Sequence, residues 1–140
     1  MEHYKPDHCY TPKPFITNLE QTAYQNINYR KVVWTGDYEQ LTVMSIPVRS
    51  DIGLEIHPDT DQIIRIEHGF GMVQMGTCKN QLNIQQRVGR GAVIFVPAGT
   101  WHNVTNIGNS NLKISTIYAP PHHKVDTIQR TKCDAMNEEN

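Results

Sequence analysis

Four polar side chains with metal-binding donor atoms stand in or beside segments whose apolar residues predict β-strands. Glu55 and His57 are two residues apart, Gln62 opens the next apolar segment, and His102 follows much later in the chain. Because successive side chains of a strand point to opposite faces, Glu55 and His57 would share one face. Gln62 would join them if the two segments pair through the loop 58–61. A buried carboxylate or imidazole is costly unless something satisfies it, so these groups either face water or hold a cation.

A divalent metal would satisfy Glu55, His57 and Gln62 together, with His102 as a fourth ligand. Two histidines, one carboxylate and open coordination positions suit iron, manganese, zinc, nickel or copper. The pattern therefore predicts a site for one divalent transition metal whose identity the residues leave open. Two alternatives remain at this point: Glu55 and His57 lie on a solvated strand face, and His102 is a surface histidine or a hydrogen-bonded core histidine.

The elements that must position these residues are short strands. Clusters of Gly, Pro, Asn, Asp and Ser separate apolar segments at a spacing of roughly 8–12 residues, which is typical of a β-sandwich or barrel. No stretch after residue 28 shows sustained helical periodicity. The expected strands are Tyr29–Thr35, Gln40–Pro47, Gly53–His57, Gln62–Glu67, Gly71–Met75, Asn80–Val88, Ala92–Val96, Trp101–Ile107 and Lys113–Tyr118.

Both ends of the chain differ in composition from this strand region. Residues 1–28 form an arm with a short helix, for which Thr17 as N-cap and Glu20 three residues later give a capping-box pattern. Residues 120–140 are expected to be an irregular tail. In it, His122 and His123 are either an exposed pair, which is the expectation, or a lid or extra ligand over the site. His3 and His8 in the arm are expected to play no part.

Composition predicts one domain and excludes several classes of partner. The chain has 140 residues and a net charge of −1, so we expect neither nucleic acid nor a membrane surface as a partner. No apolar run approaches the about 18 residues of a spanning helix, and the polar start lacks the apolar core of a signal peptide, which favours the cytoplasm. Cys9, Cys78 and Cys133 form no Cys-x-x-Cys pair, so free thiols are expected.

The spacing around His102 carries a resemblance to a known family. Gly91, five residues, Pro97, one residue, Gly99, two residues, His102, three residues and Asn106 resemble the second motif of the cupin superfamily. The region of Glu55, His57, Gln62 and Gly69 is similar to its first motif in spacing. It departs in type, because Glu55 stands where the family has its first histidine and Gln62 where it has its glutamate. Arg49 replaces the motif's leading glycine.

The resemblance implies a jelly-roll barrel over residues 29–119, similar to small single-domain bacterial cupins. It implies that the Pro97–Gly99 turn ends one strand, with Gly99 able to adopt a positive φ, and that His102 points back into the barrel mouth. Asn106 would tie a turn. By its position in the expected strand, and not by the resemblance, Tyr118 is a core residue or part of the cavity wall. Glu55, His57, Gln62 and His102 would be the metal ligands, the first and third by position only.

Three classes of function fit this pattern. The first is a metal-dependent enzyme acting on a small oxygen-bearing substrate, either an isomerase or epimerase that polarises a carbonyl group or a dioxygenase if the metal is iron. Glu55 would then be a ligand or a general base. The second is a non-catalytic binder of a small molecule or metal, and the third is a polar cluster around water without metal. No Arg and Lys cluster lies near the motifs in sequence, which argues against a phosphosugar. The sheet edges of a small jelly roll must be covered by the N-terminal arm or by a second subunit, and we expect a homodimer.

Overall fold

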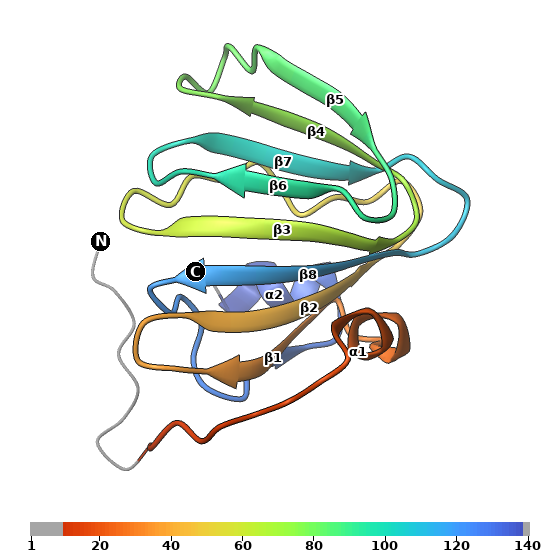
Figure 1. Ribbon diagram of the computed structural model, residues 1–140. Coiled ribbons are helices and arrows are strands. Elements are labelled where there is room, and N and C mark those ends of the chain that lie inside the picture. The colour runs from red at the N-terminus through yellow and green to blue at the C-terminus, as the bar shows by residue number, and fades with distance from the viewer. Residues whose placement is uncertain (1–9, 139–140) are drawn as a thin grey trace.

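Two antiparallel sheets face each other in the computed structural model, which describes residues 10–138 (Figure 1). The elements are α1 Leu19–Gln25, β1 Arg30–Thr35, β2 Gln40–Ile46, β3 Asp61–His68, β4 Gly71–Gly76, β5 Ile84–Val88, β6 Val93–Val96, β7 Trp101–Asn106, β8 Leu112–Ala119, β9 Ile128–Gln129 and α2 Lys132–Glu138. The larger sheet has the strand order β6-β3-β8-β2-β1-β9, and the smaller has β5-β4-β7. The predicted all-β jelly roll with a short N-terminal helix is confirmed.

The segment before β3 departs from the prediction. Gly53 has a φ of +88°, and the strand expected over Gly53–His57 is reduced to one bridge between Glu55 and His102. Pairing of this segment with the one that starts at Gln62 is therefore wrong. The physical reason is that β3 already hydrogen-bonds to β6 on one side and to β8 on the other, which leaves it no free edge.

The inner face of the larger sheet changes from apolar to polar along its strands. At one end, Met44, Ile114 and Ile66 are cross-strand neighbours and pack in the core with Val73 and Val104 of the smaller sheet. Further along the same face, the apolar Ile64, Ile94 and Val96 lie among several buried residues that are polar or carry a polar group: Thr42, Thr116, Gln40, Tyr118 and Gln62. A polar half of a barrel interior requires partners, and this half faces the segments that carry the histidines.

The N-cap of the N-terminal helix α1 lies one residue later than predicted. Asn18, not Thr17, is the N-cap, and its side-chain oxygen accepts from the backbone N–H of Gln21 at 2.9 Å. Ala23 on the buried face of α1 is fully covered, and the helix packs on β2, β3 and β8. Cys9 and the two histidines of the arm lie outside the described residues, so the predictions for them stay untested.

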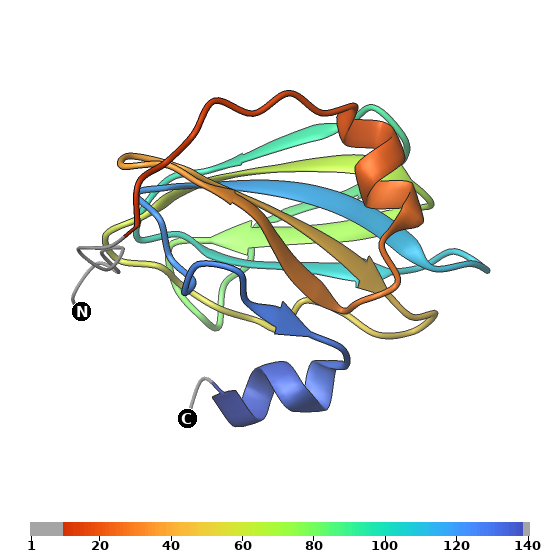
Figure 2. The same cartoon turned by 90° about the horizontal axis from the view of Figure 1, so that it is seen from below.

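The segment after Ala119 is structured, so the predicted irregular tail is wrong. Strand β9 extends the larger sheet beside β1, and α2 buries Ala135 against the core. Lys132 at the start of α2 forms an ion pair with Asp51. Figure 2 shows α1 and α2 on opposite sides of the molecule. A seven-residue helix with one buried side chain has no apolar stripe, which is why the sequence did not predict it.

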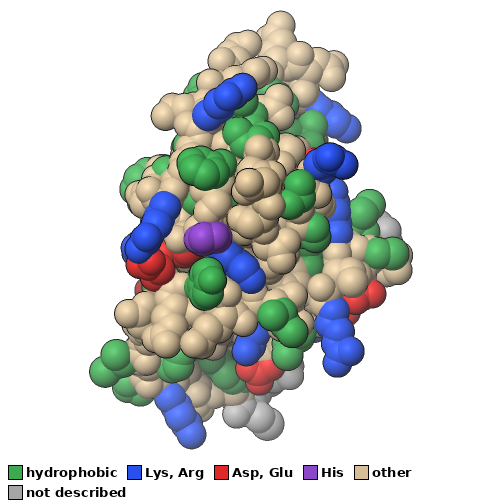
Figure 3. Space-filling view, turned by 90° about the vertical axis from the view of Figure 1, so that its right-hand side faces the viewer, with side chains coloured by type: hydrophobic (Ala, Val, Ile, Leu, Met, Phe, Trp, Pro, Cys, Tyr) green, Lys and Arg blue, Asp and Glu red, His purple; other side chains and the backbone are tan. Residues whose placement is uncertain are grey.

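Charged side chains are dispersed over the surface. On the face seen in Figure 3, basic side chains stand singly among acidic, apolar and polar ones. This agrees with the near-zero net charge. None of the helices in residues 10–138 is long and apolar enough to cross a membrane. Cys78 and Cys133 are exposed free thiols.

Candidate metal centre

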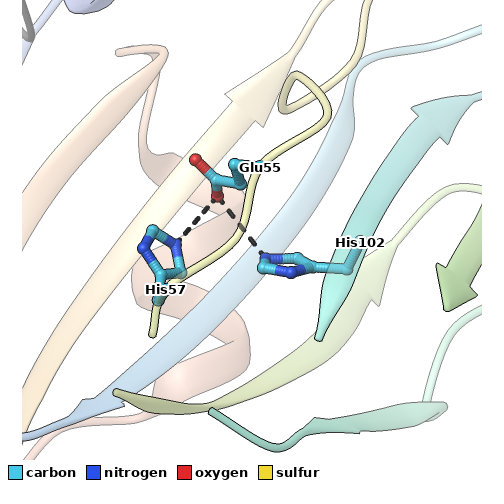
Figure 4. A group of neighbouring side chains, drawn as sticks. All are labelled: Glu55, His57 and His102. Carbon is cyan, nitrogen blue, oxygen red and sulfur yellow. Dashed lines mark ion pairs between the residues drawn. The ribbon is translucent and has the colours of Figure 1, made fainter. Parts of the chain in front are cut away.

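Glu55, His57 and His102 converge at one end of the barrel (Figure 4). Glu55 Oε1 lies 3.2 Å from Nε2 of His57 and 3.6 Å from Nε2 of His102. The two imidazoles are buried, with ring centroids 5.5 Å apart, and the Glu55 side chain is 22% exposed. Each of the three side chains offers one potential ligand atom, and these three atoms all lie within 4.8 Å of one another.

Backbone hydrogen bonds hold the three segments of this site together. In the bridge between the two segments, the N–H groups of Glu55 and His102 each donate to the other's carbonyl at 3.1 and 3.0 Å. The turn before β7 reaches the third residue, because the N–H of Gly99 donates to the carbonyl of His57 at 2.9 Å. Gly99 has a φ of +80°, which favours glycine and confirms the role predicted for it.

The orientation of His102 leaves one ring nitrogen for a ligand. Its Nδ1 lies 2.9 Å from the carbonyl oxygen of Thr100, so Nδ1 carries the proton and donates. Nε2 of His102 and Nε2 of His57 are buried, and among residues 10–138 neither has a hydrogen-bond partner of normal geometry. Burial acts to raise the pKa of Glu55, but the imidazoles of His102 and His57 and the charge of Arg30 outweigh it, so this pKa lies below its usual range. An anionic carboxylate therefore faces two buried ring nitrogens.

The spacing of these donor atoms fits one metal ion. Ligand atoms about 2.1 Å from a common ion are roughly 3.0 Å apart at a right angle and roughly 3.4 Å apart in a tetrahedron. The distances of 3.2 and 3.6 Å from Glu55 Oε1 lie close to these values. The donor set and the orphaned Nε2 atoms therefore fit a divalent transition metal.

Gln62 and Tyr118 lie next to each other on the opposite wall. They are cross-strand partners on β3 and β8, and both are buried. The ring of Tyr118 is 5.9 Å from the ring of His57, and Oε1 of Gln62 is buried with no hydrogen-bond partner among the described residues. Gln62 thus offers an unused oxygen on the wall beside the three converging residues.

The expected exposure of His122 and His123 is wrong. The His122 ring lies 4.4 Å from that of His57 and stacks on Tyr118 at 5.3 Å, while His123 is buried edge-on to Tyr118 at 5.2 Å. Burial lowers the pKa of His122 to about 4, and the His57 charge adds to this effect. Proline-rich sequence around the pair predicted a free tail, but the chain instead turns back over the barrel mouth.

Gln40 holds the segment of His122 and His123 in place, a role that the sequence did not predict. Its fully buried amide donates to the carbonyl of His123 at 2.8 Å and to Thr35 Oγ1 at 2.9 Å. Its oxygen accepts from the backbone N–H groups of His122 and His123 at 3.1 and 2.9 Å. No signal in the sequence pointed to this role beyond the inward position of Gln40 on β2, because His122 and His123 are more than 80 residues away.

Basic residues do reach the site, contrary to what the sequence around the motifs suggested. Arg30 on β1 and Lys132 on α2 line the same cavity of about 310 Å³ as Glu55. Arg30 donates to Gln129 Oε1 at 2.8 Å, and Lys132 is paired with Asp51. Both residues are far from the motifs in sequence, so only the folded chain brings them there.

Asn106 ties a turn, as predicted. Its amide nitrogen donates to the carbonyls of Ile46 and Ser110, both at 2.9 Å, and its oxygen accepts from the N–H of Gly108 at 2.9 Å. This network fixes the end of β7 against β2, and so fixes the strand that carries His102.

A jelly roll with two histidines and a carboxylate at one end defines a class of protein, the cupin-type barrel with a candidate metal centre. Residues 42–118 match the family model described as the cupin domain. The chain belongs to the cupin family, which confirms the resemblance found in its motifs.

Several known proteins are similar to this chain. The uncharacterized protein YrkC of Bacillus subtilis (strain 168) is 51% identical over 127 residues, which is 91% of this chain and 68% of that protein. The crystal structure of BH2720 from Bacillus halodurans has 49% identity and a TM-score of 0.89, covering 94% of this chain and 98% of that one. A predicted oxalate decarboxylase from Thermotoga maritima has 23% identity and a TM-score of 0.53, over 59% of this chain and 67% of that one, and shows the fold alone.

Proposed function

We propose that this protein binds one divalent transition metal through Glu55, His57 and His102, with Gln62 as a fourth ligand. One observation carries the proposal. Two buried Nε2 atoms without hydrogen-bond partners among the described residues face the same carboxylate oxygen, at 3.2 and 3.6 Å. Without a cation, this arrangement leaves two buried ring nitrogens with no hydrogen-bond partner among the described residues, which is costly. A metal ion removes that cost.

We further propose that the protein is a metal-dependent enzyme for a small oxygen-bearing substrate, of the isomerase or epimerase type or of the dioxygenase type. When bound, the metal supplies Lewis-acid polarisation of a substrate oxygen, or oxygen chemistry if it is iron. The chain's own groups hold the ion, exclude water and orient the ligand. Glu55 serves as a ligand, because its Oε1 is the atom that faces both imidazoles.

A second candidate is a non-catalytic binder of a small molecule or metal. The covered mouth favours it, since the His122 ring lies 4.4 Å from His57 and its backbone is held by Gln40. Turnover distinguishes the two, because an enzyme must open this segment in every cycle. A binder would retain one ligand tightly and convert nothing.

Metal content tests the proposal most directly. Protein purified without added metal should contain close to one transition-metal ion per chain by elemental analysis. His57→Ala and His102→Ala should lose it, because each removes one of three converging donors, while circular dichroism stays that of a folded β protein. His68→Ala is the matched control, since His68 is exposed and contacts Tyr24. Stoichiometric metal in either active-site variant would remove the ligand set.

We also propose a homodimer formed through the outer face of the larger sheet. A row of apolar side chains crosses four strands there, all pointing away from the core and at least partly exposed: Leu41, Ile117, Ile63 and Phe95. Phe95 is 67% exposed. A second copy of the same row would bury it, as is usual for a two-fold interface.

A further inference from the structure

Two buried threonine hydroxyls inside the barrel have no hydrogen-bond partner among residues 10–138. Thr42 on β2 and Thr116 on β8 are directly opposite each other in the larger sheet. Both are essentially fully buried, with exposed fractions of 0% and 1%, and neither Oγ1 makes a hydrogen bond there. A buried hydroxyl without a partner costs free energy, and valine fills the same shape without that cost. Two such hydroxyls side by side therefore need an explanation outside the packing of the core.

Their position relative to the candidate metal centre supplies one. Thr116 lies two residues before Tyr118 on the same strand face, which is roughly 7 Å along β8. Tyr118 in turn lies 5.9 Å from His57. Thr42 and Thr116 therefore lie on the same inner face as Tyr118 and Gln62. They are one step further from the histidines, next to the apolar core.

A third orphaned group lies beside Tyr118. His123 Nε2 is buried without a partner in the described part of the chain, and the His123 ring lies edge-on to Tyr118 at 5.2 Å. Burial, with the charge of Arg30 adding to it, lowers the pKa of His123 far below its usual range, so this imidazole is neutral. The wall consequently offers hydroxyl and imidazole groups that both donate and accept.

These groups select the chemistry of a ligand. A hydroxyl that both donates and accepts is matched by another hydroxyl. The threonine pair itself carries no charge, so a ligand hydroxyl matches it better than a carboxylate or phosphate does. A carbonyl oxygen, by contrast, is suited to the metal ligands at the other end of the site.

We infer that Thr42 and Thr116 form a subsite for the hydroxyl groups of a neutral hydroxyketone, whose carbonyl oxygen faces Glu55, His57 and His102. The inference rests on the proposed metal centre and narrows its substrate class to short ketoses and related hydroxyketones. The segment of His122 and His123 covers the ligand, with His123 Nε2 as a third polar contact. An ordered water on the threonine pair is the competing explanation.

The test uses the full chain loaded with zinc, and the ketopentose D-ribulose as the probe. The matched control probe is 2-pentanone, which has the same carbon chain and carbonyl group without the hydroxyls. The variants are Thr42→Val and Thr116→Val. The control is Thr105→Val, since Thr105 is a partly exposed residue of β7 that points away from the face carrying His102. Zinc content, probe affinity by saturation-transfer NMR and melting temperature are measured for each.

The wild-type protein should bind D-ribulose more tightly than 2-pentanone. Each valine variant of the pair should keep its zinc and lose about tenfold in D-ribulose affinity, because a ligand hydroxyl then lacks its partner. Affinity for 2-pentanone should not change, and the melting temperature without ligand should equal or exceed that of the wild type. Thr105→Val should behave as the wild type.

Failure of the subsite is distinguishable from failure of the metal centre. Wild-type protein that retains no zinc refutes the metal centre and the subsite with it. Retained zinc with no D-ribulose binding, or with equal binding by the valine variants, overturns the subsite alone. A lower melting temperature in both valine variants also overturns it, because the hydroxyls then serve the fold through ordered water.

Discussion

The Gln40 amide offers a single side chain through which the covered mouth of the barrel can be opened. Gln40→Leu keeps a similar volume and removes all four hydrogen bonds of the amide, which are 2.8–3.1 Å long. Three of them join β2 to the backbone of His122 and His123. We expect local opening of this segment rather than unfolding, because the freed backbone groups can bond to water once the segment moves away.

The size of the effect follows from these three bonds. At a net value of about 1 kcal/mol each, their loss lowers the opening free energy of the segment by about 3 kcal/mol, or roughly a hundredfold in population. Amide hydrogen exchange measured by NMR reports it directly, as faster exchange at His122 and His123. Gln40→Glu should fall in between, since a carboxylate oxygen still accepts from the two N–H groups, whereas the NH2 group that donates to the His123 carbonyl and to Thr35 is lost.

A matched control is available on β5. Gln86 is exposed, and Gln86→Leu adds the same side chain without touching the segment. Unchanged protection of the His122 and His123 amides in Gln40→Leu would refute the reasoning, because ring packing alone would then hold the mouth closed. Equal loss of protection throughout the barrel would also contradict it, since that result would mean global destabilisation.

Two further predictions concern the C-terminal helix and the sheet face. Lys132→Met should lower the free energy of unfolding by less than about 1 kcal/mol at neutral pH, since the pair is partly exposed. Burial acts to raise the pKa of Asp51, but hydrogen bonds from Lys132 and Asn103 leave it below 3.8. The difference should therefore be fully present above pH 3.8, decrease as the pH falls below it, and be lost once the pH passes the lowered pKa of Asp51 in the folded protein. A difference by urea unfolding that stays the same from pH 7 down to the acid limit of folding would contradict this. Phe95→Asp should halve the mass measured by light scattering, whereas Phe70→Asp, equally exposed in a turn, should not; a dimeric Phe95→Asp protein would exclude this face.

Local patterns were sufficient for most of the strands. Apolar segments separated by clusters of turn residues predicted β1 to β4 and β6 to β8 to within one or two residues. The Pro97–Gly99 turn and the role of Asn106 were implied by the resemblance to the cupin motif, and Asn106 also reaches Ile46, 60 residues away. The short α2 and the bridge at Glu55 were missed, because neither has a periodic signal.

The sequence by itself determined the barrel and named the residues that converge at its mouth, Glu55, His57 and His102. Only the tertiary structure decided what surrounds them. Gln40 binds a segment more than 80 residues away, and Arg30 and Lys132 meet Glu55 in one cavity. The buried hydroxyls of Thr42 and Thr116 find no hydrogen-bond partner within residues 10–138. The physical reason is range: a strand's alternation and a turn's glycine act on neighbouring residues, whereas the satisfaction of a buried polar group depends on whichever distant segments the fold places beside it.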